Sequence, residues 1–232
     1  MNTTQPLIRL LAGGGLLVLA SLALAGNPFP GQQPDGKLIA VQEKVADLFE
    51  QGDYQRALLI YRHELAPGGD KFAQYMVGYM FHSGRGVEPN VVEASAWYRL
   101  AAERGEASFV RLHEELWDSL TEAQRDSAAL RHANLAAELG DRAVLHRLVE
   151  KDLLLLRTRN ANQMVIQTGF GQAPTEPLSA YRRASHRLLQ RITYLERDLG
   201  DDVAATDTDR QALAELRADA EQEIARFVES LK

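Results

Sequence analysis

Ala73 to Gly105, AQYMVGYMFHSGRGVEPNVVEASAWYRLAAERG, is the stretch that decides the fold of this 232-residue chain. Small, aromatic and glycine residues recur in it at helical spacing on both sides of a turn that contains Gly84 and Gly86. Glycine adopts positive φ at little cost, so these two residues predict the end of a first helix. The stretch therefore predicts a helix-turn-helix unit, which in repeat proteins serves to bind partners.

Each helix of this unit carries a stripe of core-forming residues. In the first helix Ala73, Val77 and Phe81 lie one turn apart, and Gly78 beside them lets a second helix approach closely. The stripe of the second helix comprises Ala94, Trp97, Tyr98, Ala101 and Ala102. Asn90 is the predicted N-cap of that helix, after Pro89, and Gly105 ends it. Trp97 and Tyr98 suit a helix core, with stacking on a ligand as the alternative.

These residues resemble the Sel-one-like repeat (SLR) family, a branch of the tetratricopeptide (TPR) superfamily. The family pattern runs Ala-x-x-x-Leu-Gly-x-x-Tyr/Phe-x-x-Gly-x-Gly-Val-x-x-Asp/Asn, then Lys/Glu-Ala-x-x-Trp-Tyr-x-x-Ala-Ala-x-x-Gly. The chain departs from it mildly, with Val77 for leucine and Asn90 for the usual aspartate. The repeat-defining residues are Ala73, Gly78, Tyr79, Gly84, Gly86, Ala94, Trp97, Tyr98, Ala101, Ala102 and Gly105. The resemblance implies a protein-binding solenoid, and bacterial SLR proteins are adaptors in envelope assembly, signalling and host contact.

Degenerate copies of the unit flank it. Upstream, Ala57 and Tyr61 stand 37 residues before Ala94 and Tyr98. Downstream, Ala136, Ala137 and Gly140 repeat Ala101, Ala102 and Gly105 at a shift of 35. The glycine turn is absent from this last copy, where Thr121 and Gln124 have the spacing of a capping box. We therefore expect an all-α protein with a short TPR/SLR-like solenoid over residues 37–156.

The N-terminus has the features of an export signal. The stretch from Leu7 to Leu24 is apolar except for Arg9 near its start, which is its only charged side chain. Ala23-Leu24-Ala25 forms a small-x-small cleavage site. Residues 1–25 are thus the predicted signal peptide, followed by a disordered start over 26–36, and the predicted location is the periplasm. An uncleaved anchor is the alternative, and only in that case would the protein contact a membrane. The chain has no cysteine, so disulfides and a cysteine-linked lipid anchor are excluded.

Charge is distributed unevenly along the C-terminal third. The chain has 26 Lys and Arg against 32 Asp and Glu, a net charge of −6 that argues against general nucleic-acid binding. Residues 157–197 are rich in arginine, whereas residues 198–232 are acidic. Apolar residues at three- and four-residue steps predict an antiparallel helical hairpin over 177–232, after a loop over 157–176. In this hairpin Thr208 and Gln211 have capping-box spacing.

Arg183, Arg187 and Arg191 line one flank of the first predicted hairpin helix. One interpretation is a charge match with the acidic helix, in which each exposed pair contributes at most about 1 kcal/mol. The other is that this flank binds an acidic envelope polymer or the carboxylates of a partner protein.

Catalytic chemistry has little support. His113-Glu114 begins like the zinc motif HExxH, but residue 117 is Trp, so the second ligand is missing. We expect no cofactor, no metal site and no catalytic residue, with an envelope hydrolase assembled across helices as the remaining alternative. The partner is expected to be a protein or peptide segment. The residues predicted to contact it are those that the core stripe leaves free, namely Gln74, Arg111 and Glu115, together with the arginine flank.

Overall fold

The computed structural model describes residues 36–166, 175–202 and 205–229, and none of these forms a β-strand. The all-α prediction is confirmed. The predicted signal peptide and residues 26–35 lie outside the described residues. The chain divides into two units between Val144 and Leu145, and each unit is described by itself.

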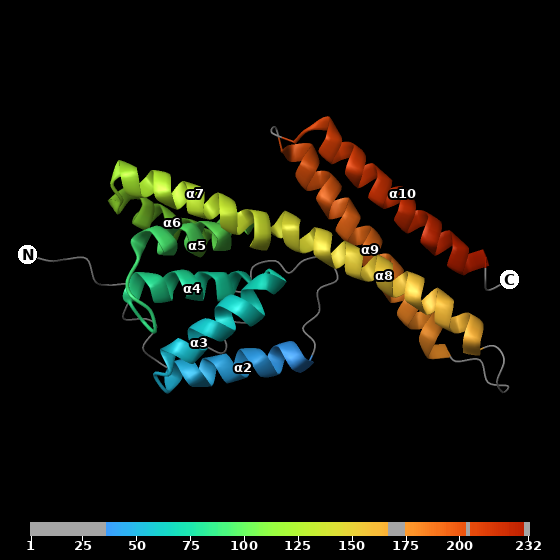
Figure 1. Cartoon of the computed structure of the whole chain (residues 1–232), viewed down its shortest axis with the longest axis horizontal. Coiled ribbons are helices and arrows are strands. Elements are labelled where there is room, and N and C mark those ends of the chain that lie inside the picture. Colours follow the sequence, from blue (N-terminus) through green and yellow to red (C-terminus); the bar gives the residue numbers. More distant parts are fainter. Residues whose placement is uncertain (1–35, 167–174, 203–204, 230–232) are drawn as a thin grey trace, which may run out of the picture. The chain divides into compact units, whose positions relative to one another are not determined.

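The first unit is built from helix pairs (Figure 1). Helix α2 (Gly36–Glu50) packs on α3 (Tyr54–Ile60), and α4 (Lys71–Ser83) packs on α5 (Val91–Ala101). The third pair in chain order is α6 (Ala107–Ser119) and α7 (Glu122–Leu139), and each of these helices packs mainly on α5 and not on the other. The sequence-predicted repeat unit is therefore the central pair of three.

The local signals of the central pair act as the sequence predicts. Gly84 and Gly86 adopt φ angles of 70° and 76°, which end α4 in the left-handed region. The side chain of Asn90 caps α5 by accepting from the N–H groups of Val92 and Glu93. Gly105 has φ 71° after a short 3-10 turn, η4 (Ala102–Arg104). These caps fix where both helices begin and end.

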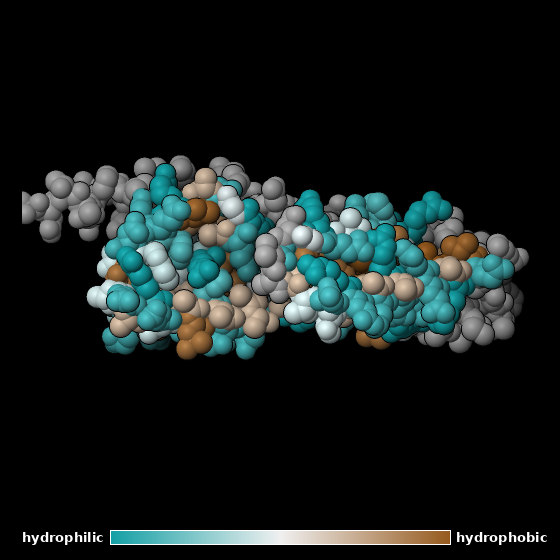
Figure 2. Space-filling view, turned by 90° about the horizontal axis from the view of Figure 1, so that it is seen from above, coloured by the Kyte–Doolittle hydropathy of each residue, from teal (hydrophilic) through white to brown (hydrophobic). Residues whose placement is uncertain are grey.

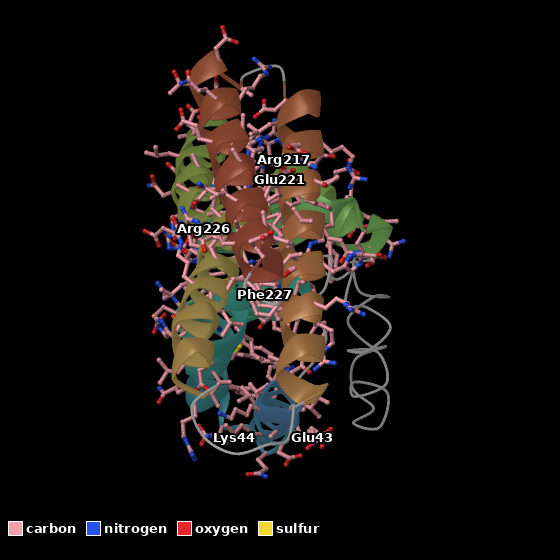
Figure 3. All side chains as sticks on the ribbon, turned by 90° about the vertical axis from the view of Figure 1, so that its right-hand side faces the viewer. Glu43, Lys44, Arg217, Glu221, Arg226 and Phe227 are labelled. Carbon is pink, nitrogen blue, oxygen red and sulfur yellow. The ribbon has the colours of Figure 1, made fainter. Side chains whose placement is uncertain are left out.

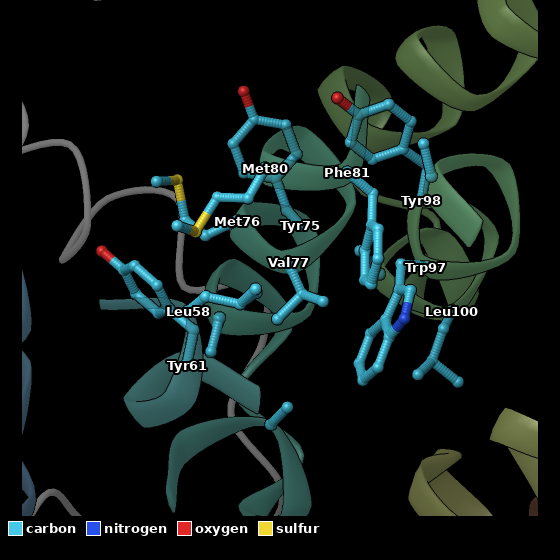
Figure 4. Close-up of a cluster of buried hydrophobic side chains, with 14 of the residues drawn as sticks. Leu58, Tyr61, Tyr75, Met76, Val77, Met80, Phe81, Trp97, Tyr98 and Leu100 are labelled. Atoms are coloured by element: carbon cyan, nitrogen blue, oxygen red, sulfur yellow. The ribbon is translucent and has the colours of Figure 1, made fainter. Parts of the chain in front are cut away.

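Trp97 and Tyr98 lie in the core and not in a ligand site. Trp97 is 1% exposed and Tyr98 3% exposed, and both join a cluster of side chains from α3, α4 and α5 (Figure 4). A Cβ placed on Gly78 would lie 2.6 Å from the Tyr98 ring, so only glycine allows α4 and α5 to approach this closely. This confirms the contact that the glycine predicts.

Helix α3 ends irregularly. It continues into a π-helical turn, η2 (Tyr61–Leu65), and a 3-10 turn, η3 (Ala66–Gly68). A π turn holds one residue more than an α turn, so Tyr61 and Leu65 remain buried although the helix changes its pitch.

The third pair keeps the cap that its sequence predicts. Thr121 and Gln124 form the capping box at the start of α7. Gly140, however, has φ −66° and ψ 160°, an extended conformation unlike that of Gly105. Its lack of a side chain serves a close approach, because a Cβ there would lie 2.5 Å from the carbonyl oxygen of Ala136.

The second unit contains the rest of α8 (Asp141–Ile166) with α9 (Thr175–Asp201) and α10 (Asp207–Glu229). The predicted loop over 157–176 is wrong over most of its length, because α8 runs to Ile166 and α9 begins at Thr175. The solenoid boundary at 156 is correspondingly too late, since the first unit ends inside α8 at Val144.

The predicted hairpin of α9 and α10 is present and antiparallel (Figure 1). Phe227 near the end of α10 stacks on Tyr181 near the start of α9, and Arg217 pairs with Glu196 farther along (Figure 3). The predicted cap at Thr208 is wrong by one half turn, because Thr206 caps α10 by accepting from the Asp209 N–H.

Figure 2 shows a face on which hydrophilic residues dominate and apolar residues appear in small groups. In the first unit the large exposed apolar residues Ile39, Leu59 and Leu130 stand on three different helices. Among the described helices, none combines the length and apolar character needed to cross a bilayer.

Candidate partner-binding surface

Helix α4 offers little free surface to a partner. Nine of its residues are buried, and most of the exposed ones lie near its C-terminus. The prediction that Gln74 is free for a partner is wrong, since its side chain is 0% exposed. Its amide nitrogen donates to the carbonyl oxygens of Ala66 and Leu139, and its oxygen accepts from Lys71. Gln74 therefore joins α4 to the start of η3 and the end of α7.

A buried charge cluster occupies the same region. The Lys71 side chain is 1% exposed, and its Nζ lies 2.7 Å from Glu103 Oε2 and 2.8 Å from Asp141 Oδ1. Nζ also donates to the Leu100 carbonyl oxygen at 3.0 Å. Arg104 binds both oxygens of Asp141, through Nε at 2.8 Å and a terminal nitrogen at 3.1 Å.

The cluster lowers the pKa of Asp141. Burial alone would raise this pKa, but the hydrogen bonds from Arg104 and the charges of Lys71 and Arg104 outweigh it. Asp141 is the first residue of α8 and Lys71 the first of α4, so the cluster ties the start of the central pair to the end of the third. Its position is structural, and no surface for a partner remains there.

Arg111 and Glu115 lie on α6 and remain exposed, at 60% and 52% of their side-chain surface. They are one turn apart, and the Arg111 Nε to Glu115 Oε1 distance of 3.9 Å makes a weak ion pair. Their exposure leaves them accessible, and their role in binding stays a prediction.

A small cavity lies between α2, η2 and α4. Its apolar lining includes Val45, Phe49, Phe72 and Met76, with Glu50 at its edge. The volume of about 30 Å³ suits a water molecule and is too small for a side chain of a partner.

Arg85 is the central residue of the glycine turn and is surrounded by aromatic rings. Its guanidinium carbon lies 5.5 Å from the ring centroid of Phe49, 5.1 Å from that of Tyr54 and 5.3 Å from that of Tyr79. All three distances fall in the cation–π range of roughly 6 Å. Arg85 and the three rings are half-buried, so the group still reaches the surface. We call these four residues the Arg85 cluster.

In the second unit, Arg187 and Arg191 are engaged inside the fold. Both bind Asp152 of α8, Arg187 at 2.8 Å and Arg191 at 2.5 Å, and Arg191 is only 5% exposed. The expectation that they offer an exposed basic flank to an acidic polymer is therefore wrong. The proposed charge match with the acidic helix is also incorrect for these two residues, because their counter-ion lies on α8. Arg183 lies one turn before Arg187 on α9 and is exposed.

Ser95 and two histidines of the first unit have buried polar atoms. The Nε2 atoms of His113 and His132 and the hydroxyl of Ser95 are buried without a hydrogen-bond partner. Burial lowers the pKa of His132 to about 4, with smaller contributions from the charges of Arg99, His113 and Lys71. Burial and Arg99 lower the pKa of His113 as well. Both imidazoles are thus neutral at pH 7.

Within the described ranges, no three His, Cys, Asp or Glu side chains are placed to bind one metal ion. The residues that sequence reasoning missed are Lys71, Arg85 and Asp152, whose charged or aromatic partners come from other elements of the fold.

The three stacked helix pairs of the first unit define an α-solenoid of the tetratricopeptide type. Comparison with protein families matches the Sel1 repeat at residues 71–106 and again at residues 124–141. The first match covers α4, α5 and η4, and the second covers most of α7. The chain therefore carries Sel1 repeats, which commonly mediate protein–protein interaction. Comparison with curated proteins and with solved structures gives no match.

Proposed function

We propose that this protein is a non-catalytic adaptor of the periplasm, and that its first unit binds a segment of another protein. The observation that carries the proposal is the Sel1 repeat itself, folded as the central pair of three. The fold is typical of proteins without catalytic activity. The apolar segment from Leu7 to Leu24 and the Ala23-Leu24-Ala25 site support export.

In-cell crosslinking tests binding. The full-length chain is expressed with a photoreactive amino acid at position 111 or 115, both exposed on α6, and crosslinked proteins are identified by mass spectrometry. A partner is accepted only if purified components bind each other and the Arg111→Glu/Glu115→Arg variant weakens that binding. The matched control carries the reactive group at Glu221, exposed on α10 in the second unit (Figure 3). The absence of any direct partner would contradict the adaptor function.

Cell fractionation tests the location. We expect the protein in the periplasmic fraction with Gly26 as its first residue. A product that starts at Met1 and stays in the membrane fraction would favour the uncleaved anchor.

A further inference from the structure

We propose that the Arg85 cluster is a carboxylate-binding site, in which the guanidinium receives an aspartate or glutamate side chain of the bound protein segment. This inference rests on the proposed protein-binding function and assigns it a site. The position differs from the one that sequence reasoning chose, since Arg85 belongs to the glycine turn and not to a helix face.

The turn holds the arginine in place. Gly84 and Gly86 flank it with positive φ, and a Cβ on Gly86 would lie 2.6 Å from the backbone of Tyr54. The turn therefore contacts the start of α3 closely. The rings around Arg85 come from three helices, with Phe49 on α2, Tyr54 on α3 and Tyr79 on α4. A side chain held this way loses little further freedom when it binds a ligand.

The hydrogen-bonding edge of Arg85 is unused. No described side chain or carbonyl forms a hydrogen bond or ion pair with its guanidinium, whereas Arg104 and Arg191 have carboxylate partners. A guanidinium stacks through its faces and donates hydrogen bonds through its edges. The three rings lie within 5.5 Å of the guanidinium carbon, and none of them is a carboxylate or carbonyl acceptor, so the N–H groups are available to an incoming acceptor.

The site suits a carboxylate of a protein. A planar guanidinium binds a carboxylate through two parallel N–H···O bonds, and one positive charge matches one negative charge. Recognition of phosphate groups generally uses clusters of arginines, and this site has one. Half-buried aromatic rings beside an arginine are also the composition of energetic centres in protein–protein interfaces. The net charge of −6 makes a nucleic acid a poor alternative.

Peptide selection tests the site. The full-length chain is immobilised, and a display library of random twelve-residue peptides is selected in parallel on the native protein, Arg85→Gln, Arg85→Lys and a control, Arg56→Gln. Arg56 is exposed on α3, two residues from Tyr54, and already pairs with Asp53. Circular dichroism verifies that each variant has the native helical signal.

We expect peptides enriched on the native protein to share one Asp or Glu. Calorimetry should show at least tenfold weaker binding for the Asp→Asn or Glu→Gln peptide, and an equal loss for Arg85→Gln with no further loss when both changes are combined. Arg85→Lys should also bind at least tenfold more weakly, because a lysine lacks the planar fork, and Arg56→Gln should bind normally.

Each other outcome overturns the site. Peptides that bind the native protein and Arg85→Gln equally would keep the protein-binding function and remove Arg85 from it. A library that yields no binder would contradict both the protein-binding function and the carboxylate site at Arg85. Displacement of acidic peptides by millimolar inorganic phosphate alone, with no effect of equimolar acetate, would indicate a phosphate site instead.

Discussion

Replacing Lys71 with methionine should destabilise the first unit, because it removes the cation that Glu103 and Asp141 share. Methionine has nearly the same length, so the change tests charge and hydrogen bonding more than volume. In the native protein Nζ lies within 3.0 Å of four oxygens, from Gln74, Leu100, Glu103 and Asp141. In Lys71→Met all four lose a donor, and two of them, on Gln74 and Leu100, belong to residues that are 0% exposed.

The expected loss of stability depends on the contacts that Glu103 and Asp141 keep in the variant. Removing one partner of a buried ion pair costs about 3–5 kcal/mol. Asp141 keeps Arg104, and Glu103 still accepts from the Asp141 backbone N–H at 3.1 Å. We therefore expect a loss near the lower bound, about 3 kcal/mol. With a urea dependence of about 2 kcal/mol per molar, the unfolding midpoint should fall by about 1.5 M.

Tryptophan fluorescence measures this loss selectively, because Trp97 and Trp117, the two tryptophans of the chain, both lie in the first unit. The control is Lys44→Met, at an exposed lysine of α2 (Figure 3), which should change stability by less than about 0.5 kcal/mol. A Lys71→Met variant as stable as the native protein would refute the reasoning. It would mean that the desolvation free energy of the buried lysine equals the stabilisation from its four contacts.

Three further predictions concern packing, pH and the second unit. Gly78→Ala should cost about 1–3 kcal/mol, since its Cβ would overlap the Tyr98 ring, whereas Gly68→Ala, with open space around it, should cost far less; urea titration compares them. Because burial holds the folded-state pKa of His132 at about 4, below the unfolded value of 6.5, stability should be complete above pH 6.5 and fall as the pH drops toward 4. His132→Gln should flatten that slope in fluorescence-detected unfolding, and an unchanged slope would show that another group is responsible. Asp152→Asn should cost about 3–5 kcal/mol, because it leaves the buried Arg191 without a counter-ion; circular dichroism detects it, and a loss below about 1 kcal/mol would argue that water solvates the arginine.

Local chemistry made the central repeat predictable. Gly84, Gly86 and Asn90 act within a few residues of themselves, through φ angles and caps, and such effects are visible in a sequence. The stripe containing Trp97 and Tyr98 was equally visible because one helix pair forms that part of the core.

Burial from a third direction was not predictable in this way. Gln74 lies off the apolar stripe of α4, so a single helix pair would leave it exposed, yet the start of η3 and the end of α7 contact it. The burial of Lys71 has the same cause, because it depends on the ion pairs with Glu103 and Asp141, which lie on other elements. No spacing within the repeat relates these residues.

The amino-acid composition of residues 157–166, unlike their apolar periodicity, is consistent with the continuation of α8. Residues 157–166 lack an apolar stripe but contain no Gly or Pro, and they include Arg, Gln, Met and Ala, which favour helices. The first glycine after Leu156 is Gly169, beyond the observed helix end at Ile166. The net charge of residues 198–232 predicted that Arg187 and Arg191 pair with the acidic helix. Both pair instead with a single carboxylate on α8, that of Asp152.

The π-helical turn over Tyr61–Leu65 bears on the residue spacing between neighbouring repeats. The spacing from Ala57 to Ala94 is 37 residues and crosses this turn, whereas the spacing from Ala101 to Ala136 is 35. One extra residue in a helix is accommodated by widening one turn from α to π without shifting the residues on either side. Deletion of one exposed residue there, such as His63, should therefore restore an α-turn and shorten the spacing from Ala57 to Ala94 to 36 residues.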